Sequence, residues 1–283
     1  MPVRPLRLTA ATAAAVFALI TTAAALPAGT ETVTAGAVAA TLTWDAGPGG
    51  QTVNHARLRI VRDGTTAFNR SIADVVCDAC ELASVPAGER QHGDVGLFDL
   101  DHDGEPEVVA EGFTGGAECC VNVGIYDYRP ATGGYGRIVR SFATNDYSLQ
   151  DLDHDKRLEI VSHDQRFDGL FGDDVGSWPP PVVQRFEHHG AAARLVDVTR
   201  RYPSVVQRDA RRARALIDRT DLFGVPVPAV LAGYVADEEL LGRGDLGMRM
   251  IKLLTKRGAL GSPRHAAAYR TRLLKLLRRF GYR

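Results

Sequence analysis

The chain has 283 residues, of which 45% are hydrophobic and 24% charged, and its formal net charge is zero. This composition is typical of a globular protein with one or two domains, and it excludes a disordered or collagen-like chain. The charge is unevenly placed: residues 201–283 contain 18 Lys and Arg against 7 Asp and Glu, which leaves 16 against 27 for residues 1–200. We therefore expect an acidic first part and a basic second part with different roles.

The first residues have the pattern of an export signal. Arg4 and Arg7 precede an apolar run from about Thr9 to Leu26, which ends among small residues. This pattern predicts a secretory signal peptide over residues 1–25, with an uncleaved N-terminal anchor as the alternative. No later stretch has 18 apolar residues in succession, so we expect no membrane span in the mature chain. The sequence thus predicts a secreted or extracellular protein, with a flexible leader over residues 26–39.

Residues 40–200 have the pattern of a β domain. Asp63-Gly64 is a strong hairpin signal in the first segment, which carries no acidic loop. Val121, Val123 and Ile125 alternate as in a half-buried strand. The rest divides into two units of four short strands each. These strands are predicted at residues 95–99, 107–113, 119–128, 135–142, 147–151, 158–163, 182–187 and 193–198.

Two nine-residue stretches, DLDHDGEPE at residues 99–107 and DLDHDKRLE at residues 151–159, repeat at an interval of 52 residues. Both place acidic side chains at positions one, three, five and nine, directly before an apolar segment. Calcium takes six to eight oxygen ligands, and carboxylates on alternate residues of a tight loop can converge on one ion. An EF-hand is excluded, because position twelve is Ala110 or Ser162 and both flanks are predicted to be strands. A plain acidic turn is the alternative.

The two loops resemble those of FG-GAP/VCBS-type repeats, which carry a D-x-D-x-D-G-x-x-D calcium loop in a β-hairpin. The resemblance covers about residues 93–200. It implies calcium as cofactor, with one ligand set in each loop. The implied side-chain ligands are Asp99, Asp101, Asp103 and Glu107 in the first loop and Asp151, Asp153, Asp155 and Glu159 in the second, with the backbone carbonyls of Glu105 and Arg157. Two features depart from the family pattern: position nine is Glu in both loops, and position six of the second loop is Lys156 in place of glycine.

The resemblance also implies propeller-like units of four strands. Two units are clear, and the segment before them would make a third. Because a closed propeller needs about four or more blades, a compact β domain built from such units is the alternative.

The four cysteines, Cys77, Cys80, Cys119 and Cys120, predict disulfides in an exported chain. A bond between the neighbours Cys119 and Cys120 would be strained, so we favour two bonds that join the 77–80 segment to the 119–120 segment. A zinc site and a redox C-x-x-C motif are the alternatives.

From Tyr202 the apolar residues follow a helical period. Four helices are expected, starting near Pro203, at about Pro228, at Asp245 and at Ser262-Pro263. The last helix is strongly basic. Three roles are open for its cations. They form a solvated face of the bundle, they dock on the acidic β domain, or they bind an anionic partner such as a membrane surface or an acidic cell-wall polymer. We expect no nucleic-acid partner, since no basic patch with interleaved aromatic residues stands out.

Signals of catalysis are weak. The sequence contains no G-x-S-x-G elbow, no phosphate-binding G-x-x-x-x-G-K-[ST] and no H-E-x-x-H helix. The pair His188-His189 is expected in an exposed turn, and His102 and His154 are expected to be shared features of the repeat without a ligand role. An acidic and aromatic segment offers the remaining possibility, a carbohydrate cleft with paired acids, although a disordered surface loop is favoured. Its residues are Asp164, Asp168, Asp173 and Asp174, with Phe167, Phe171 and Trp178.

The sequence therefore favours a secreted, non-catalytic, calcium-binding repeat protein with a structural or adhesive role, in which the ligand is a surface, a polysaccharide or another protein. The alternative is a secreted hydrolase that acts on glycans through acids of residues 164–174.

Overall fold

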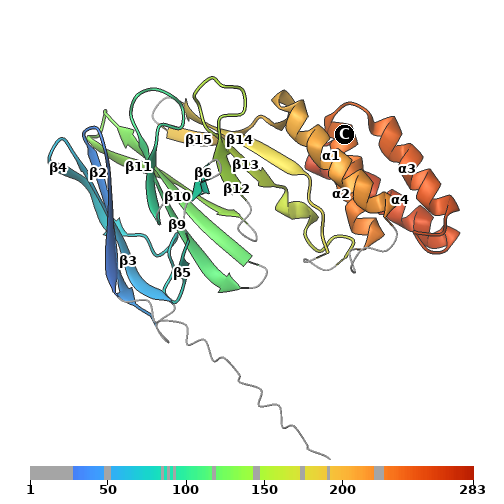
Figure 1. Cartoon of the computed structure of the whole chain (residues 1–283), viewed down its shortest axis with the longest axis horizontal. Helices are drawn as coiled ribbons and strands as arrows, with labels where there is room; N and C mark the ends of the chain where they lie inside the picture. The colour runs from blue at the N-terminus through green and yellow to red at the C-terminus, as the bar shows by residue number, and fades with distance from the viewer. Residues whose placement is uncertain are drawn as a thin grey trace, which may run out of the picture.

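The computed structural model describes residues 28–47, 52–83, 86–87, 90–91, 94–116, 119–142, 147–172, 176–189, 192–219 and 226–283. Its three β-sheets follow one another in space, and the helices lie together at the far end (Figure 1). The predicted order, mainly β and then α-helical, is confirmed. The predicted signal peptide over residues 1–25 lies outside the described residues.

The first sheet is an antiparallel meander in the order β1-β2-β3-β4. Its strands are β1 (Gly29–Ala35), β2 (Val38–Ala46), β3 (Val53–Arg62) and β4 (Thr65–Ser71). The turn between β3 and β4 is Asp63-Gly64, as the sequence predicts, and both residues have positive φ. The prediction of a flexible leader over residues 26–39 is wrong from Gly29 onward, because β1 pairs with β2 along its whole length.

The second and third sheets each contain one of the two predicted four-stranded units. In the second sheet β11-β10-β9 continues to β5, and β8 also pairs with β9. The third sheet has the order β15-β14-β13-β12-β6-β7. The second sheet consists of β5 (Glu81–Leu82), β8 (Val95–Phe98), β9 (Glu107–Gly116), β10 (Cys119–Arg129) and β11 (Gly134–Phe142). The third consists of β6 (Pro86–Ala87), β7 (Arg90–Gln91), β12 (Tyr147–Gln150), β13 (Glu159–His163), β14 (Pro181–His189) and β15 (Ala192–Asp197).

The sheets pack face to face, and the core lies between them. Consecutive strand residues point to opposite faces, so one strand contributes to two core layers. On β9, Val108 packs between the first and second sheets, whereas Val109 packs between the second and third. On β10, Tyr126 likewise packs between the first and second sheets, and Ile125 packs between the second and third. This stacking follows from strands that are apolar on both faces, and the propeller-like character of the units stays a prediction.

The described part of the chain ends in the four predicted helices, α1 (Pro203–Asp218), α2 (Val227–Leu240), α3 (Gly244–Lys256) and α4 (Pro263–Phe280). Helix α2 is buried along most of its length, because the other helices and the segment around Trp178 surround it. The Ser262 hydroxyl caps α4 by accepting a hydrogen bond from the His265 N–H, and Gly281 ends it with a φ of 84°. No described helix is both long and apolar enough to cross a membrane.

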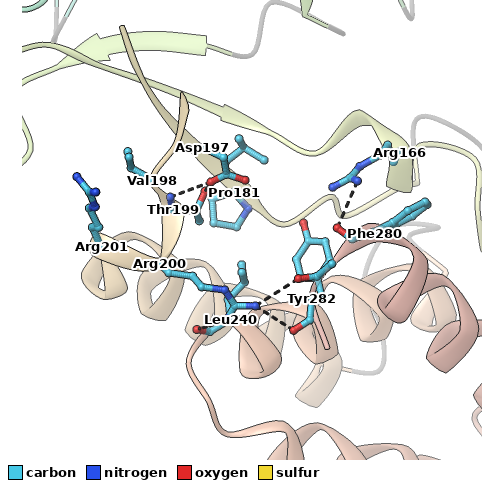
Figure 2. A pocket seen from close by; sticks show the side chains of 12 residues that line it. Arg166, Pro181, Asp197, Val198, Thr199, Arg200, Arg201, Leu240, Phe280 and Tyr282 are labelled. Atoms are coloured by element: carbon cyan, nitrogen blue, oxygen red, sulfur yellow. Dashed lines mark hydrogen bonds between the residues drawn. The ribbon is translucent and has the colours of Figure 1, made fainter. Parts of the chain in front are cut away.

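Polar contacts join the third sheet to the helices. Figure 2 shows Arg200, in a short 3₁₀ turn (Thr199–Arg201), beside the ends of α2 and α4. Its guanidinium donates to the carbonyls of Leu240 and Tyr282, at 3.3 and 3.1 Å. The Tyr282 hydroxyl in turn donates to Asp164 Oδ2 at 2.8 Å. The guanidinium thus satisfies carbonyls that helix ends leave without intrahelical partners.

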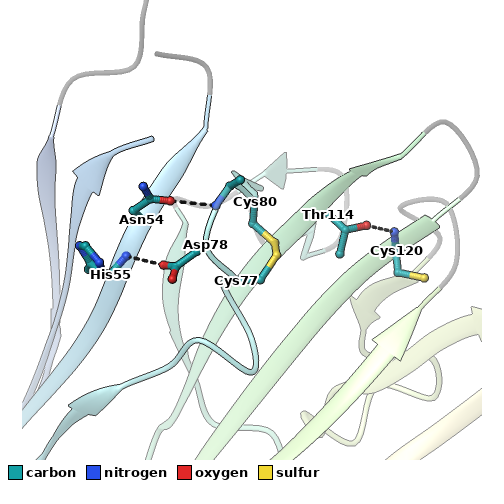
Figure 3. Close-up of a disulfide and its surroundings, with 8 residues drawn as sticks. Asn54, His55, Cys77, Asp78, Cys80, Thr114 and Cys120 are labelled. Carbon is teal, nitrogen blue, oxygen red and sulfur yellow. Dashed lines mark hydrogen bonds between the residues drawn. A yellow bond between two sulfur atoms is a disulfide. The ribbon is translucent and has the colours of Figure 1, made fainter. Parts of the chain in front are cut away.

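The prediction of a disulfide is confirmed, but the predicted pairing is wrong, because Cys77 bonds to Cys80 and not to the 119–120 segment (Figure 3). Their Cα atoms lie 5.1 Å apart across a tight turn, in which the Cys80 N–H donates to the Cys77 carbonyl at 3.0 Å. Neither cysteine is therefore available to Cys119, Cys120 or a zinc ion. The turn lies between β4 and β5 and not between a strand and a helix, so the redox reading lacks the context it requires.

Candidate metal centre

The two acidic loops occupy the same place in their units. The first joins β8 to β9, the second joins β12 to β13, and position nine of each loop opens the second strand. Positions four and six have left-handed backbones in both loops: φ is 57° at His102 and 63° at His154, and 90° at Gly104 and 70° at Lys156. Lysine thus adopts the strained conformation that glycine takes freely in the first loop.

The two loops also share their internal hydrogen bonds. Glu107 Oε2 accepts from the Leu100 N–H at 2.9 Å, and Glu159 Oε2 accepts from the Leu152 N–H at 3.0 Å. At position one, Asp99 Oδ2 accepts from the N–H of residue 104 at 3.0 Å, and Asp151 Oδ2 accepts from that of residue 156 at 3.2 Å. Each loop is therefore closed by its own first and last acids, which turns the acidic side chains inward.

In the first loop, Asp99, Asp101 and Glu107 each offer an oxygen, and these oxygens lie within 4.8 Å of one another. Glu107 is 1% exposed, and Asp101 Oδ1 is buried without a hydrogen-bond partner. The Glu105 side chain turns away to an ion pair with Arg62. No Lys or Arg within the described ranges forms an ion pair with the three clustered acids. The cluster is thus a group of converging oxygens without an internal cation.

The pKa values in the first loop reflect this crowding. Burial, together with the charges of the neighbouring aspartates, raises the pKa of Glu107 to about 9, although the hydrogen bond from Leu100 lowers it. Burial and the charge of Asp103 also raise the pKa of Asp101. The loop therefore holds its carboxylates at an electrostatic cost that a bound cation would remove.

A further buried acid lies beside this loop. Tyr126 pairs with Val108 in the antiparallel ladder of β9 and β10, so the adjoining Asp127 stands across from Glu107. Its side chain is 1% exposed, one oxygen accepts from Arg129 at 3.2 Å, and the other is buried without a hydrogen-bond partner.

The second loop contains its own cation. Asp151, Asp153 and Glu159 form a second group of converging oxygens, and Asp151 Oδ1 is again buried without a hydrogen-bond partner. Here Glu159 pairs across the ladder with Arg185 of β14. The Arg185 Nη2 atom lies 2.7 Å from Glu159 Oε1 and 3.2 Å from Asp153 Oδ2, and it lies 3.5 Å from Asp155 Oδ2. The guanidinium thus supplies positive charge among the carboxylates.

Arg185 is tightly held in this position. It is 8% exposed, and Tyr202 contacts both sides of the pair, since its hydroxyl lies 2.5 Å from Arg185 Nη2 and donates to Asp153 Oδ2 at 3.0 Å. Burial lowers the pKa of Arg185, but the hydrogen bond to Glu159 and the surrounding negative groups raise it more. Burial raises the pKa of Asp153, yet the hydrogen bond from Tyr202 and the charge of Arg185 lower this pKa overall. The second loop is therefore a copy of the first in which a guanidinium offsets part of the negative charge.

His188 is a site residue that the sequence did not predict. It belongs to strand β14 and not to a turn, and its Nε2 lies 3.7 Å from Asp101 Oδ2 in the other unit. With Asp101 and Asp103 it forms a third group of potential ligand atoms. No local pattern could indicate this contact, since 87 positions of the chain separate the residues.

The acidic and aromatic segment does not form a carbohydrate cleft from its described residues. Phe167 is buried in the helical core, and Phe171 and Trp178 pack against it. Asp164 caps the 3₁₀ turn Gln165–Phe167 and accepts hydrogen bonds from Arg166 and Tyr282. The expectation of a disordered surface loop is therefore wrong for residues 165–172 and 176–180. Asp173 and Asp174 lie outside the described residues.

Comparisons of the chain with protein-family models, curated proteins and solved structures give no match.

Proposed function

We propose that this chain is a secreted, non-catalytic repeat protein of the FG-GAP/VCBS type, in which calcium bound to the first acidic loop stabilises the β region for a structural or adhesive role. The observation that carries the proposal is the convergence of Asp99, Asp101 and Glu107 without an internal cation.

The donor set of the first loop fits calcium. All three converging side chains offer carboxylate oxygens, which are the ligands that this hard cation prefers. Asp103 is adjacent and the Glu105 carbonyl is the remaining implied ligand. Bound calcium would neutralise the crowded carboxylates and hold the β8–β9 hairpin closed.

The repeat character is supported by the two equivalent units. Each is a four-stranded antiparallel meander, and each places the same hydrogen-bonded loop between its first two strands. The first sheet is a third meander without an acidic loop. Stacked repeat units of this kind suit a structural role or the binding of a protein or polysaccharide surface.

A thermal melt with calcium or with excess chelator, at constant ionic strength, tests the proposal. At a free calcium concentration 100 times the Kd, binding to the native state adds about 2.7 kcal/mol, which raises Tm by roughly 5 to 10 °C for a chain of this size. Magnesium at the same concentration is the control, because its small octahedral shell fits a crowded carboxylate loop less well. Superimposed melts with calcium and chelator would overturn the calcium role.

A further inference from the structure

A groove of about 630 Å³ is lined by residues of α3 and α4. These two helices lie at the end of the molecule away from the β-sheets (Figure 1). Its floor is apolar: Ile251 and Ala266 are buried there, and Met248 is half-buried. Ala267 and Pro263 are small exposed residues on the α4 side, so the groove has room for inserted side chains. A recess of this size is within the range of protein ligand sites.

Cations follow the groove along its length. Arg249, Lys252 and Lys256 lie at intervals of three and four on α3, which places them on one face over about 10 Å. Arg270 faces them from α4. Asp245 pairs with Arg249 at 2.5 Å, whereas Lys252, Lys256 and Arg270 are exposed and form no ion pair within the described ranges.

The stretch that forms α3 and α4 adds little negative charge to this row. Residues 244–283 contain 11 Lys and Arg, and Asp245 is the single acid among them. The basic face does not dock on the acidic β region, because the junction is made by Arg200, Asp164 and Tyr282 at the other end of the bundle (Figure 2). An occupant of the groove would therefore supply the missing acids.

We propose that the α3–α4 groove binds an acidic amphipathic helix of a partner protein. Its apolar face would contact Ile251 and Ala266, and acidic side chains at helical spacing would pair with Lys252, Lys256 and Arg270. Opposite charges along both edges would fix the register and speed the encounter.

The spacing of the cations favours a helix over a lipid. A single lipid carries its charge at one end, so its hydrocarbon tail would lie against the remaining cations along the row. A flat membrane surface would reach the rim and leave the recessed floor uncovered. A helix with acids at every third or fourth position matches charge and apolar surface together.

The test is fluorescence anisotropy with the full chain and a synthetic helical peptide of about 15 residues, which carries an apolar stripe flanked by glutamates. A peptide of the same composition with its apolar residues scattered around the helix is the probe control. We expect the amphipathic peptide to bind at least tenfold more tightly than the scattered one. We also expect Lys252→Glu with Lys256→Glu to weaken its binding at least tenfold, and Ala267→Trp to do the same by filling the groove.

The matched control is Arg208→Glu with Arg211→Glu, the same charge change on exposed positions of α1. It should alter binding less than threefold, and circular dichroism should show that all variants stay folded. Three results would overturn the proposal: no binding of the amphipathic peptide, equal loss in the α1 control, or anionic vesicles that bind the chain and are not displaced by the peptide. Chelator should leave peptide binding unchanged, which separates this site from the calcium loop.

Discussion

The two acidic loops start from the same geometry and balance their charge in different ways. Both fold around the same pair of hydrogen bonds, and both bring three carboxylates together. In the second unit Arg185 pairs with the last loop acid across the ladder. In the first unit the register that pairs Tyr126 with Val108 brings Asp127, a further buried acid, to the corresponding position. One cross-strand position therefore separates a loop that contains its own cation from a loop that lacks one.

This difference explains how two loops with nearly the same sequence can differ in the source of their compensating positive charge. A buried carboxylate requires a compensating charge, and either a guanidinium from the chain or an ion from solution supplies it. The guanidinium is part of the chain, so the second loop receives compensating charge without an ion from solution. We propose that the first loop takes its compensating charge from calcium, which makes the stability of its unit depend on the calcium concentration.

The largest expected effect comes from removing the internal cation. Arg185→Met leaves Glu159 buried without its partner and should lower the free energy of unfolding by about 3 to 5 kcal/mol. Calcium should restore part of this loss, because the vacated loop then resembles the first. Urea denaturation with and without calcium measures both effects.

Arg194→Met on the neighbouring strand β15 is the control for that variant. The Arg194 side chain is 52% exposed and pairs weakly with Glu187 at 3.9 Å. Its loss should change stability by less than about 1 kcal/mol. An equally small effect at Arg185 would show that the guanidinium does not neutralise the second loop.

A smaller effect is expected when one aspartate of each loop is replaced by asparagine and the calcium responses of the two variants are compared. Asp101→Asn removes a ligand charge from the first loop and should abolish the calcium-dependent rise in Tm, which corresponds to about 2.7 kcal/mol at 100 times the Kd. Asp153→Asn, at the same position of the second loop, should preserve that rise. Thermal melts of both variants, with and without calcium, measure this difference. If Asp153→Asn loses the calcium response and Asp101→Asn keeps it, calcium binds the second loop and not the first.

The smallest effect concerns the backbone at position six. Lys156 has a φ of 70°, where glycine avoids the steric cost of a side chain, so Lys156→Gly should stabilise the chain by about 1 kcal/mol. The reverse change, Gly104→Lys, should destabilise it by a similar amount. Chemical denaturation of both variants gives the two values. Changes of the same sign in both would mean that backbone strain does not distinguish the loops.

Local patterns in the sequence predict much of this structure. The repeated spacing of Asp99 and Asp151 indicates two equivalent loops. Alternation and helical periods indicate the strands of the two units and all four helices, whereas β1, β5, β6 and β7 are not predicted. The pattern also indicates that Lys156 would be strained. These features depend on interactions between residues that are close in the sequence, so a single stretch is enough to predict them.

The features that sequence reasoning missed depend on tertiary contacts. Arg185 reaches the second loop because β14 pairs with β13 in one particular register, and His188 reaches the first loop from a different sheet. The Cys77–Cys80 bond depends on the shape of one turn. Aromatic residues such as Trp178 give the same signal in a ligand cleft and in a core, and only the position of α2 decides between them.

Isothermal titration calorimetry of the wild-type chain with calcium tests the difference between the loops most directly, because it counts bound ions. We predict one calcium ion per chain, with binding lost in Asp101→Asn and retained in Asp153→Asn. Two ions per chain would show that Arg185 does not exclude calcium from the second loop. No uptake would show that the first loop is an acidic turn that needs no ion.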